Sequence, residues 1–235
     1  MSYQFDYSIV SLNLPILLQG AANSLIISFI SIVFGFSLGL VLALLRSLNI
    51  KAIKYFIISY VELIRNTPFI VQLFIVYFVL PRIGIYVEAY PAGIIALSLN
   101  CAGYATEILR AGIESIHESQ IEAARSLGMT YFQTFRYAIL KPALITIFPS
   151  LSSLFITILL GSSVLSAIST PELTSIAYSI TAYKYRHFEI FSFIAVFYLL
   201  MSNILSIMFK YFEFRFLSIE GKQSISKFFH NVLLG

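Results

Sequence analysis

Residues 115–142 read SIHESQIEAARSLGMTYFQTFRYAILKP and form the most polar stretch of an otherwise apolar chain. They carry Glu118, Glu122, Arg125, Arg136 and Lys141, whereas the segments on either side are apolar enough to lie in lipid. A charged side chain at the centre of a bilayer costs about 2.5–3.5 kcal/mol, so this stretch must lie in water. The sequence therefore predicts a membrane protein with an exposed polar loop at residues 115–142.

Capping signals predict how the polar loop folds. Ser119 followed by Glu122, and Thr130 followed by Gln133, each have the spacing of a capping box at a helix start. Gly128 between them suits the left-handed residue that ends a helix. We expect helix, glycine turn, helix. The first helix is rich in alanine and has little core of its own, so its apolar face is predicted to fit a groove of another protein. The alternative is a loop helix that packs on its own bundle.

Composition supports the membrane assignment. The 235 residues are 59% hydrophobic and only 11% charged, which is not typical of a soluble domain. Apolar runs of about 20 residues are long enough to cross a bilayer. We predict an all-α integral membrane protein, one domain over residues 1–235, whose five spans lie at about 21–46, 55–80, 92–112, 143–168 and 188–210. Residues 7–20 are predicted as a short interfacial helix, and Pro68 is predicted to interrupt the second span.

The distribution of Lys and Arg predicts the orientation, because cytoplasmic loops carry an excess of them. Eleven fall on the side of the polar loop: Arg46, Lys51, Lys54, Arg110, Arg125, Arg136, Lys141, Lys210, Arg215, Lys222 and Lys227. Three fall on the other side: Arg82, Lys184 and Arg186. Arg65 lies near the start of the second span. The polar loop and the C-terminus are therefore predicted to be cytoplasmic, and the N-terminus outside.

The residue inventory argues against an enzyme. Asp6 is the only aspartate, so paired acidic metal sites have almost nothing to be built from. No metal-ligand spacing involves Cys101 or the three His. The chain has no GxxxxGK[ST] loop for ATP and no basic stripe for nucleic acid. We expect no catalytic residue, no metal and no bound cofactor.

Polar side chains on the third predicted span indicate a passage. Asn100, Tyr104 and Glu107 have the spacing i, i+4 and i+7, which places them on one stripe of a helix. Polar groups inside a membrane usually face a cavity or a partner. Gln72, one turn after Pro68, can join them. For Glu107 alone, an ion pair with Arg110 is an equally good interpretation.

These residues resemble permease subunits of ATP-binding-cassette importers of the polar amino acid branch. Glu122-Ala123-Ala124, Gly128, Ile139-Leu140 and Pro142 are similar to the family's EAA loop. Several other motifs match along residues 18–216: Tyr60-Val61-Glu62, Arg65-Asn66-Thr67-Pro68, Gln72-Leu73-Phe74, Asn100, Tyr104, Glu107, Arg110-Ala111-Gly112-Ile113 and Glu172-Leu173.

The resemblance implies a type I importer permease fold in the bacterial cytoplasmic (inner) membrane, with a coupling-helix loop at residues 115–142. Its implied ATPase-coupling residues are Gln120, Glu122, Ala123, Ala124, Leu127 and Gly128. Its implied partners are a dimer of ATPase subunits, which binds the ATP, and an extracytoplasmic solute-binding protein. The implied function is inward transport of a polar amino acid or similar solute. The alternative is a passive channel or a membrane-anchoring interaction subunit.

The fourth span departs from the family. Relatives typically have Lys-Asp-Thr-Ser-Leu where this chain has Leu160-Gly161-Ser162-Ser163-Val164. The hydroxyls of Ser162 and Ser163 can bind a substrate or their own helix carbonyls. With the charged pair missing, no cation in the middle of a span is predicted to meet a substrate carboxylate. We therefore expect the chain to pair with a second, different permease, and favour this heterodimer over a homodimer.

Overall fold

The computed structural model describes residues 5–48 and 50–217, and every regular element within these ranges is a helix. The α-helices are α1 (Ser8–Ser47), α2 (Lys51–Arg65), α3 (Phe69–Phe74), α4 (Ala89–Glu114), α5 (Glu118–Ser126), α6 (Tyr131–Gln133), α7 (Lys141–Gly161), α8 (Leu173–Lys184) and α9 (His187–Phe212). The segments η1 (Ile75–Val79), η3 (Thr134–Leu140) and η5 (Glu213–Leu217) are π-helical, and η2 (Leu80–Ile83) and η4 (Ser162–Ile168) are 3-10 helices. The predicted all-α fold is confirmed.

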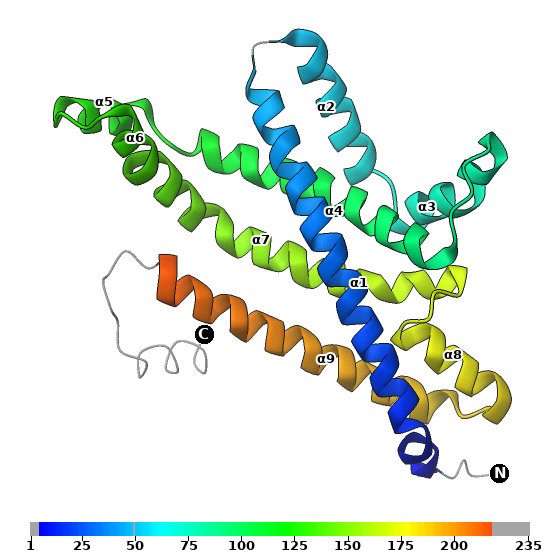
Figure 1. The fold of residues 1–235 in the computed structure, drawn as a ribbon. Helices are drawn as coiled ribbons and strands as arrows, with labels where there is room; N and C mark the ends of the chain where they lie inside the picture. Colours follow the sequence, from blue (N-terminus) through cyan, green and yellow to red (C-terminus); the bar gives the residue numbers. More distant parts are fainter. Residues whose placement is uncertain (1–4, 49, 218–235) are drawn as a thin grey trace.

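Within residues 5–48 and 50–217, four helical stretches are long and apolar enough to cross a membrane: Ser8–Ser47, Ala89–Glu114, Tyr131–Ile168 and His187–Arg215. A fifth crossing is formed if α2 and the helical stretch Phe69–Ile83 count as one span, although they meet at an angle of 110°. The prediction of about five spans with an interrupted second one is confirmed. Figure 1 shows α4, α7 and α9 running beside one another, with α1 crossing them.

Small residues set the closest helix contact, between α1 and α4. A Cβ atom placed on Gly35 would lie 2.5 Å from the Cβ of Cys101, and one on Gly39 would lie 2.8 Å from the Cβ of Ala105. Glycine at these two positions therefore allows the backbones to approach, as expected of small residues four apart in a membrane helix. The hydroxyl of Thr106 also donates to the Gly39 carbonyl at 3.3 Å.

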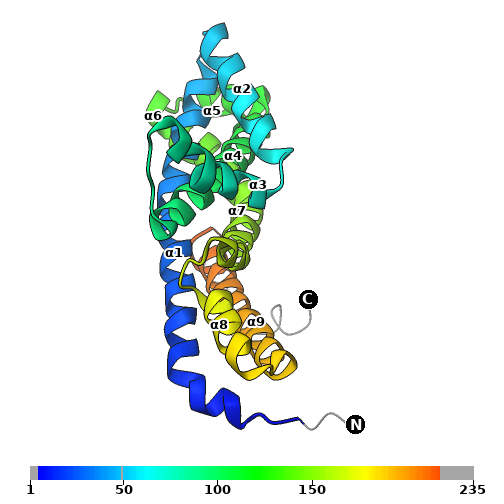
Figure 2. The ribbon, with the colours of Figure 1, turned by 90° about the vertical axis from the view of Figure 1, so that its right-hand side faces the viewer.

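The N-terminal half of α1 packs against α8 and α9, beside which it runs in Figure 2. A buried carboxylate holds these three helices together. Glu172, fully buried, caps α8 by accepting from the backbone N–H groups of Thr174 and Ser175, and it also accepts from the hydroxyls of Tyr198 on α9 and Ser24 on α1. Hydrogen bonds to a carboxylate offset part of the cost of burying it.

Two local boundaries differ from those expected. Residues 8–20 belong to the same continuous helix as the first span, so no separate interfacial helix precedes it; Pro15 is accommodated inside α1. The helix that leaves the polar loop also runs without a break from Tyr131 to Ile168, and Pro142 lies inside it, directly after the π-helical stretch η3. The tail with Lys222 and Lys227 lies outside the described residues.

Candidate functional site

The site is built around the break between α2 and α3. Pro68 has no N–H and disfavours helical backbone at the preceding residue, so α2 ends at Arg65 and α3 begins at Phe69. The Asn66 N–H closes the last turn by donating to the Glu62 carbonyl at 3.0 Å. A break of this kind exposes backbone groups that must find other partners.

Gln72 supplies hydrogen-bond partners for some of these backbone groups. Its side-chain amide donates to the carbonyl of Ile64 at 2.8 Å and to the carbonyl and hydroxyl of Thr67 at 3.0 and 3.1 Å. Its amide oxygen accepts from the Asn100 Nδ2 at 3.0 Å, which ties the break to α4. Gln72 is buried and is thus committed to holding the bend, rather than facing the open space beside it.

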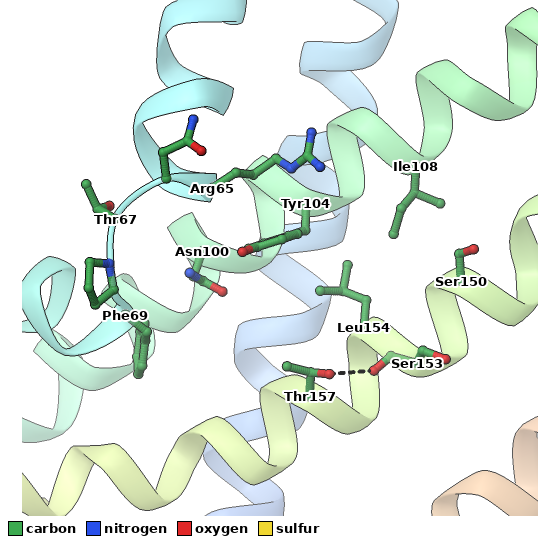
Figure 3. Close-up of a pocket in the computed structure, with 12 residues that line it drawn as sticks. Arg65, Thr67, Phe69, Asn100, Tyr104, Ile108, Ser150, Ser153, Leu154 and Thr157 are labelled. Atoms are coloured by element: carbon green, nitrogen blue, oxygen red, sulfur yellow. Dashed lines mark hydrogen bonds between the residues drawn. The ribbon is translucent and has the colours of Figure 1, made fainter.

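A pocket of about 650 Å³ lies between the break, α4 and α7. The break contributes Arg65, Asn66, Thr67, Pro68 and Phe69, α4 contributes Asn100, Tyr104 and Ile108, and α7 contributes Ser150, Ser153, Leu154 and Thr157. Figure 3 shows these side chains around the space that they enclose. The pocket is large enough for a small ligand and offers hydroxyl, amide and guanidinium groups.

Two features of this pocket were missed at the sequence level. Ser150, Ser153 and Thr157 have the spacing i, i+3 and i+7 on α7, a stripe that is as regular as the one on α4 and was available in the sequence. The sequence predicts Arg65 near the start of the second span, but its guanidinium carbon lies 5.9 Å from the centre of the Tyr104 ring and it lines the pocket. A cation thus lines this pocket, although none was expected in the middle of a span.

Glu107 is placed differently from Asn100 and Tyr104. It does not line the pocket, and its carboxylate instead joins two helices by accepting from Arg46 on α1 at 3.0 Å and from the Nε of Arg110 on α4 at 3.1 Å. Arg110 also pairs with Glu114. We call Arg46, Glu107, Arg110 and Glu114 the ion cluster; it joins the end of α1 to the end of α4.

Ser162 and Ser163 lie at the start of η4 and bond locally. The hydroxyl of Ser162 donates to the Leu159 carbonyl and that of Ser163 to the Leu160 carbonyl, each at 2.7 Å. Ser162 is fully buried, and neither side chain lines the pocket. The structure thus brings together Asn100 and Tyr104 of the predicted passage, with Gln72 behind them, and leaves Glu107, Ser162 and Ser163 elsewhere.

The polar loop contains the expected two helices and the glycine turn. Gly128 has a φ of +75°, and Thr130 and Gln133 form a capping box. The box predicted for Ser119 and Glu122 is wrong: α5 begins at Glu118, two residues earlier than a Ser119 cap requires, so Ser119 lies inside the helix and the N-cap, His117, makes no side-chain cap.

The predicted coupling residues are mostly at the surface of the polar loop. Ala124 is buried against the rest of the chain, whereas Gln120, Glu122 and Ala123 are exposed. Leu127 and Tyr131 are each 81% exposed.

Comparison with known proteins identifies the family. Residues 35–218 match the model of the binding-protein-dependent transport system inner membrane component. The chain belongs to this family. It is 33% identical over 210 residues to the probable glutamine ABC transporter permease protein GlnM of Bacillus subtilis, covering 89% of this chain and 97% of that one. It is 32% identical over 214 residues to the glutamine transport system permease protein GlnP of Escherichia coli, covering 90% and 98%.

Solved structures of ABC transporters contain chains with a fold similar to that of this permease. It matches a chain of a structure titled "Crystal structure of an amino acid ABC transporter with histidines" with a TM-score of 0.84 and 37% identity, covering 91% of this chain and all of that one. An inward-facing MetNI methionine ABC transporter is similar in fold, with a TM-score of 0.67, 22% identity and coverage of 83% and 94%. The chain is therefore a multi-pass membrane permease with the type I importer fold, which works with an ATPase and a binding protein and is not itself an enzyme.

Proposed function

We propose that this permease carries a polar amino acid into the cell through the pocket at the α2–α3 break. The observation that carries the proposal is the pocket itself: about 650 Å³, bounded by polar stripes on α4 and α7 and by the cation Arg65. A free amino acid needs a donor for its carboxylate and acceptors for its ammonium, and the pocket offers both kinds of group. The relatives named as glutamine permeases support this substrate class.

We propose that only some of the passage residues expected from the sequence contact the substrate. Arg65, Asn100 and Tyr104 contact the substrate, together with the hydroxyls of α7. Gln72 holds the bend that shapes the pocket. Glu107 fixes the relation of α1 to α4, and Ser162 and Ser163 stabilise the 3-10 turn at the end of α7.

The ATPase is proposed to dock on the polar loop through α5 and the exposed side chains that follow it. Gln120, Glu122 and Ala123 are exposed along α5, and Leu127 adds an apolar contact. Because α6, η3 and α7 form one continuous helix, a displacement of the polar loop is transmitted along α7 to the pocket. The Lys and Arg distribution supports a cytoplasmic polar loop and an external N-terminus.

A second permease chain is proposed to complete the passage. The expectation of a different second chain rested on the lack of a cation for the substrate carboxylate, and Arg65 removes that reason. The heterodimer stays a prediction. Uptake by this chain reconstituted alone with its ATPase and binding protein would establish that two copies suffice.

Reconstitution in liposomes tests the proposed function. The complete transporter should take up labelled glutamine only when ATP and the binding protein are present. Ser153→Phe, which fills part of the pocket, should remove most of this uptake, whereas Thr146→Phe at an exposed position of α7 outside the pocket should not. Glutamine uptake without ATP would support the passive channel instead, and wild-type uptake by Ser153→Phe would place the passage elsewhere.

A further inference from the structure

The charges around the pocket bear on which amino acids it accepts. Arg65 is the one charged side chain among the described residues that line the pocket. It forms no ion pair with any described residue, and the Tyr104 ring beneath it is uncharged. The other polar lining groups are hydroxyls and amides. Within the described part of the chain, the pocket thus has one positive charge and no carboxylate.

The carboxylates that are neighbours of lining residues along α2 and α4, Glu62 and Glu107, are engaged outside the pocket. Glu107 lies one turn beyond Tyr104 and is held by Arg46 and Arg110, so its charge is already compensated. Glu62 lies one turn before Asn66, on an exposed position of α2, and accepts from the Asn66 Nδ2 at 2.8 Å. Neither of them lines the cavity.

We propose, on the basis of the function proposed above, that this pocket accepts amino acids with uncharged polar side chains and rejects those with cationic side chains. The planar guanidinium of Arg65 binds the substrate carboxylate, for which its paired N–H donors are suited. The ammonium is met by the Asn100 amide oxygen and the Tyr104 hydroxyl. The Asn100 oxygen is the available atom because its nitrogen already donates to Gln72.

The side chain of the substrate then meets α7. Ser150, Ser153 and Thr157 offer hydroxyl groups that suit an amide or a hydroxyl. A second ammonium or a guanidinium would find no carboxylate there and would be repelled by Arg65. A like charge about 6 Å away at an effective dielectric constant of about 20 lowers the binding constant roughly 100-fold.

Ligand binding by the permease–ATPase complex in nanodiscs, without the binding protein, tests this selectivity. The binding protein is left out because its own substrate preference would otherwise contribute to the measured affinities. Labelled glutamine and labelled arginine are the two probes. We expect glutamine to bind at least about tenfold more tightly than arginine. Comparable or tighter binding of arginine would overturn the selectivity while the proposed function stood, and binding of neither probe would overturn the proposed function.

Two variants test whether the lack of a carboxylate in the pocket causes the weak binding of arginine. Thr157→Asp places a carboxylate on the α7 side of the pocket and should raise arginine affinity about tenfold. The matched control is Thr146→Asp, since both threonines are exposed on α7 and donate to the carbonyl four residues earlier, but Thr146 lies outside the pocket. Equal gains from both variants, or no gain from Thr157→Asp in a complex that elutes as a folded monodisperse particle, would overturn the assignment.

Discussion

The polar stripe of α4 passes through two different environments. Asn100 and Tyr104 face a pocket beside Arg65, a cation without an ion pair among the described residues. One turn later Glu107 sits in the ion cluster, where each of its oxygens accepts from an arginine. The helical spacing of polar residues therefore does not by itself distinguish residues that line a passage from residues that form a structural ion cluster. What separates them is the partner of each charged side chain. Arginines of the protein compensate Glu107, whereas Arg65 is left to pair with a ligand.

The largest effect is expected from breaking the ion cluster at its centre. Glu107→Ala leaves Arg46 and Arg110 without their acceptor and should destabilise the protein by about 1.5–3 kcal/mol, the range for hydrogen bonds to charged groups. The yield of monodisperse protein and its melting temperature in detergent should both fall. This differs from the effect on a passage residue, which lowers transport without lowering the amount of folded protein.

Glu114→Ala is the matched control for Glu107→Ala. Glu114 pairs with the same arginine, but its side chain is 64% exposed, and an exposed pair contributes only about 0–1 kcal/mol. Melting temperature should hardly change. If Glu107→Ala instead kept wild-type stability and lost only transport, Glu107 would belong to the passage after all.

The sequence predicts the architecture well because its signals are local or compositional. Apolar runs indicate the spans, Pro68 indicates the break, and Gly128 indicates the turn. The pocket is harder to predict because it depends on which side chains meet across helices. Its position along the chain predicts Arg65 near the start of the second span, but at the end of α2 it lies beside Tyr104 of α4.

A second prediction sharpens the distinction between lining the pocket and shaping it. Gln72→Met keeps the length of the side chain but removes the three hydrogen bonds from its Nε2 to the α2–α3 break and the one that its Oε1 accepts from Asn100. We expect glutamine binding to weaken, because the pocket wall loses its fixed shape, together with a moderate fall in melting temperature. Thr67→Val, which removes one of these four contacts, should cause a smaller loss of affinity. An unchanged affinity in Gln72→Met would show that the bend holds without it.

A third prediction concerns the polar loop and uses two glycines with the same strain. Gly128 and Gly84 have φ values of +75° and +90°, and a Cβ atom at either would meet nothing within 4 Å. Alanine at such a φ costs about 1–2 kcal/mol of backbone strain. Gly128→Ala should therefore weaken ATPase association several-fold, whereas Gly84→Ala, in the loop after η2, should not. Equal association in both variants would remove the polar loop from the docking surface.

The smallest effect is expected from cysteines that only report position. Ser126→Cys lies on the exposed surface of α5, and Tyr86→Cys lies in the loop between η2 and α4, where Tyr86 is 84% exposed. The native Cys101 is fully buried between α1 and α4 and should stay unreactive, so it need not be removed.

The excess of Lys and Arg on the side of the polar loop predicts that side to be cytoplasmic. In intact cells an impermeant thiol reagent should label Tyr86→Cys and spare Ser126→Cys, and permeabilised cells should label both, with transport close to wild type in each variant. Labelling of Ser126→Cys in intact cells would reverse the orientation and, with it, the assignment of the polar loop to the ATPase.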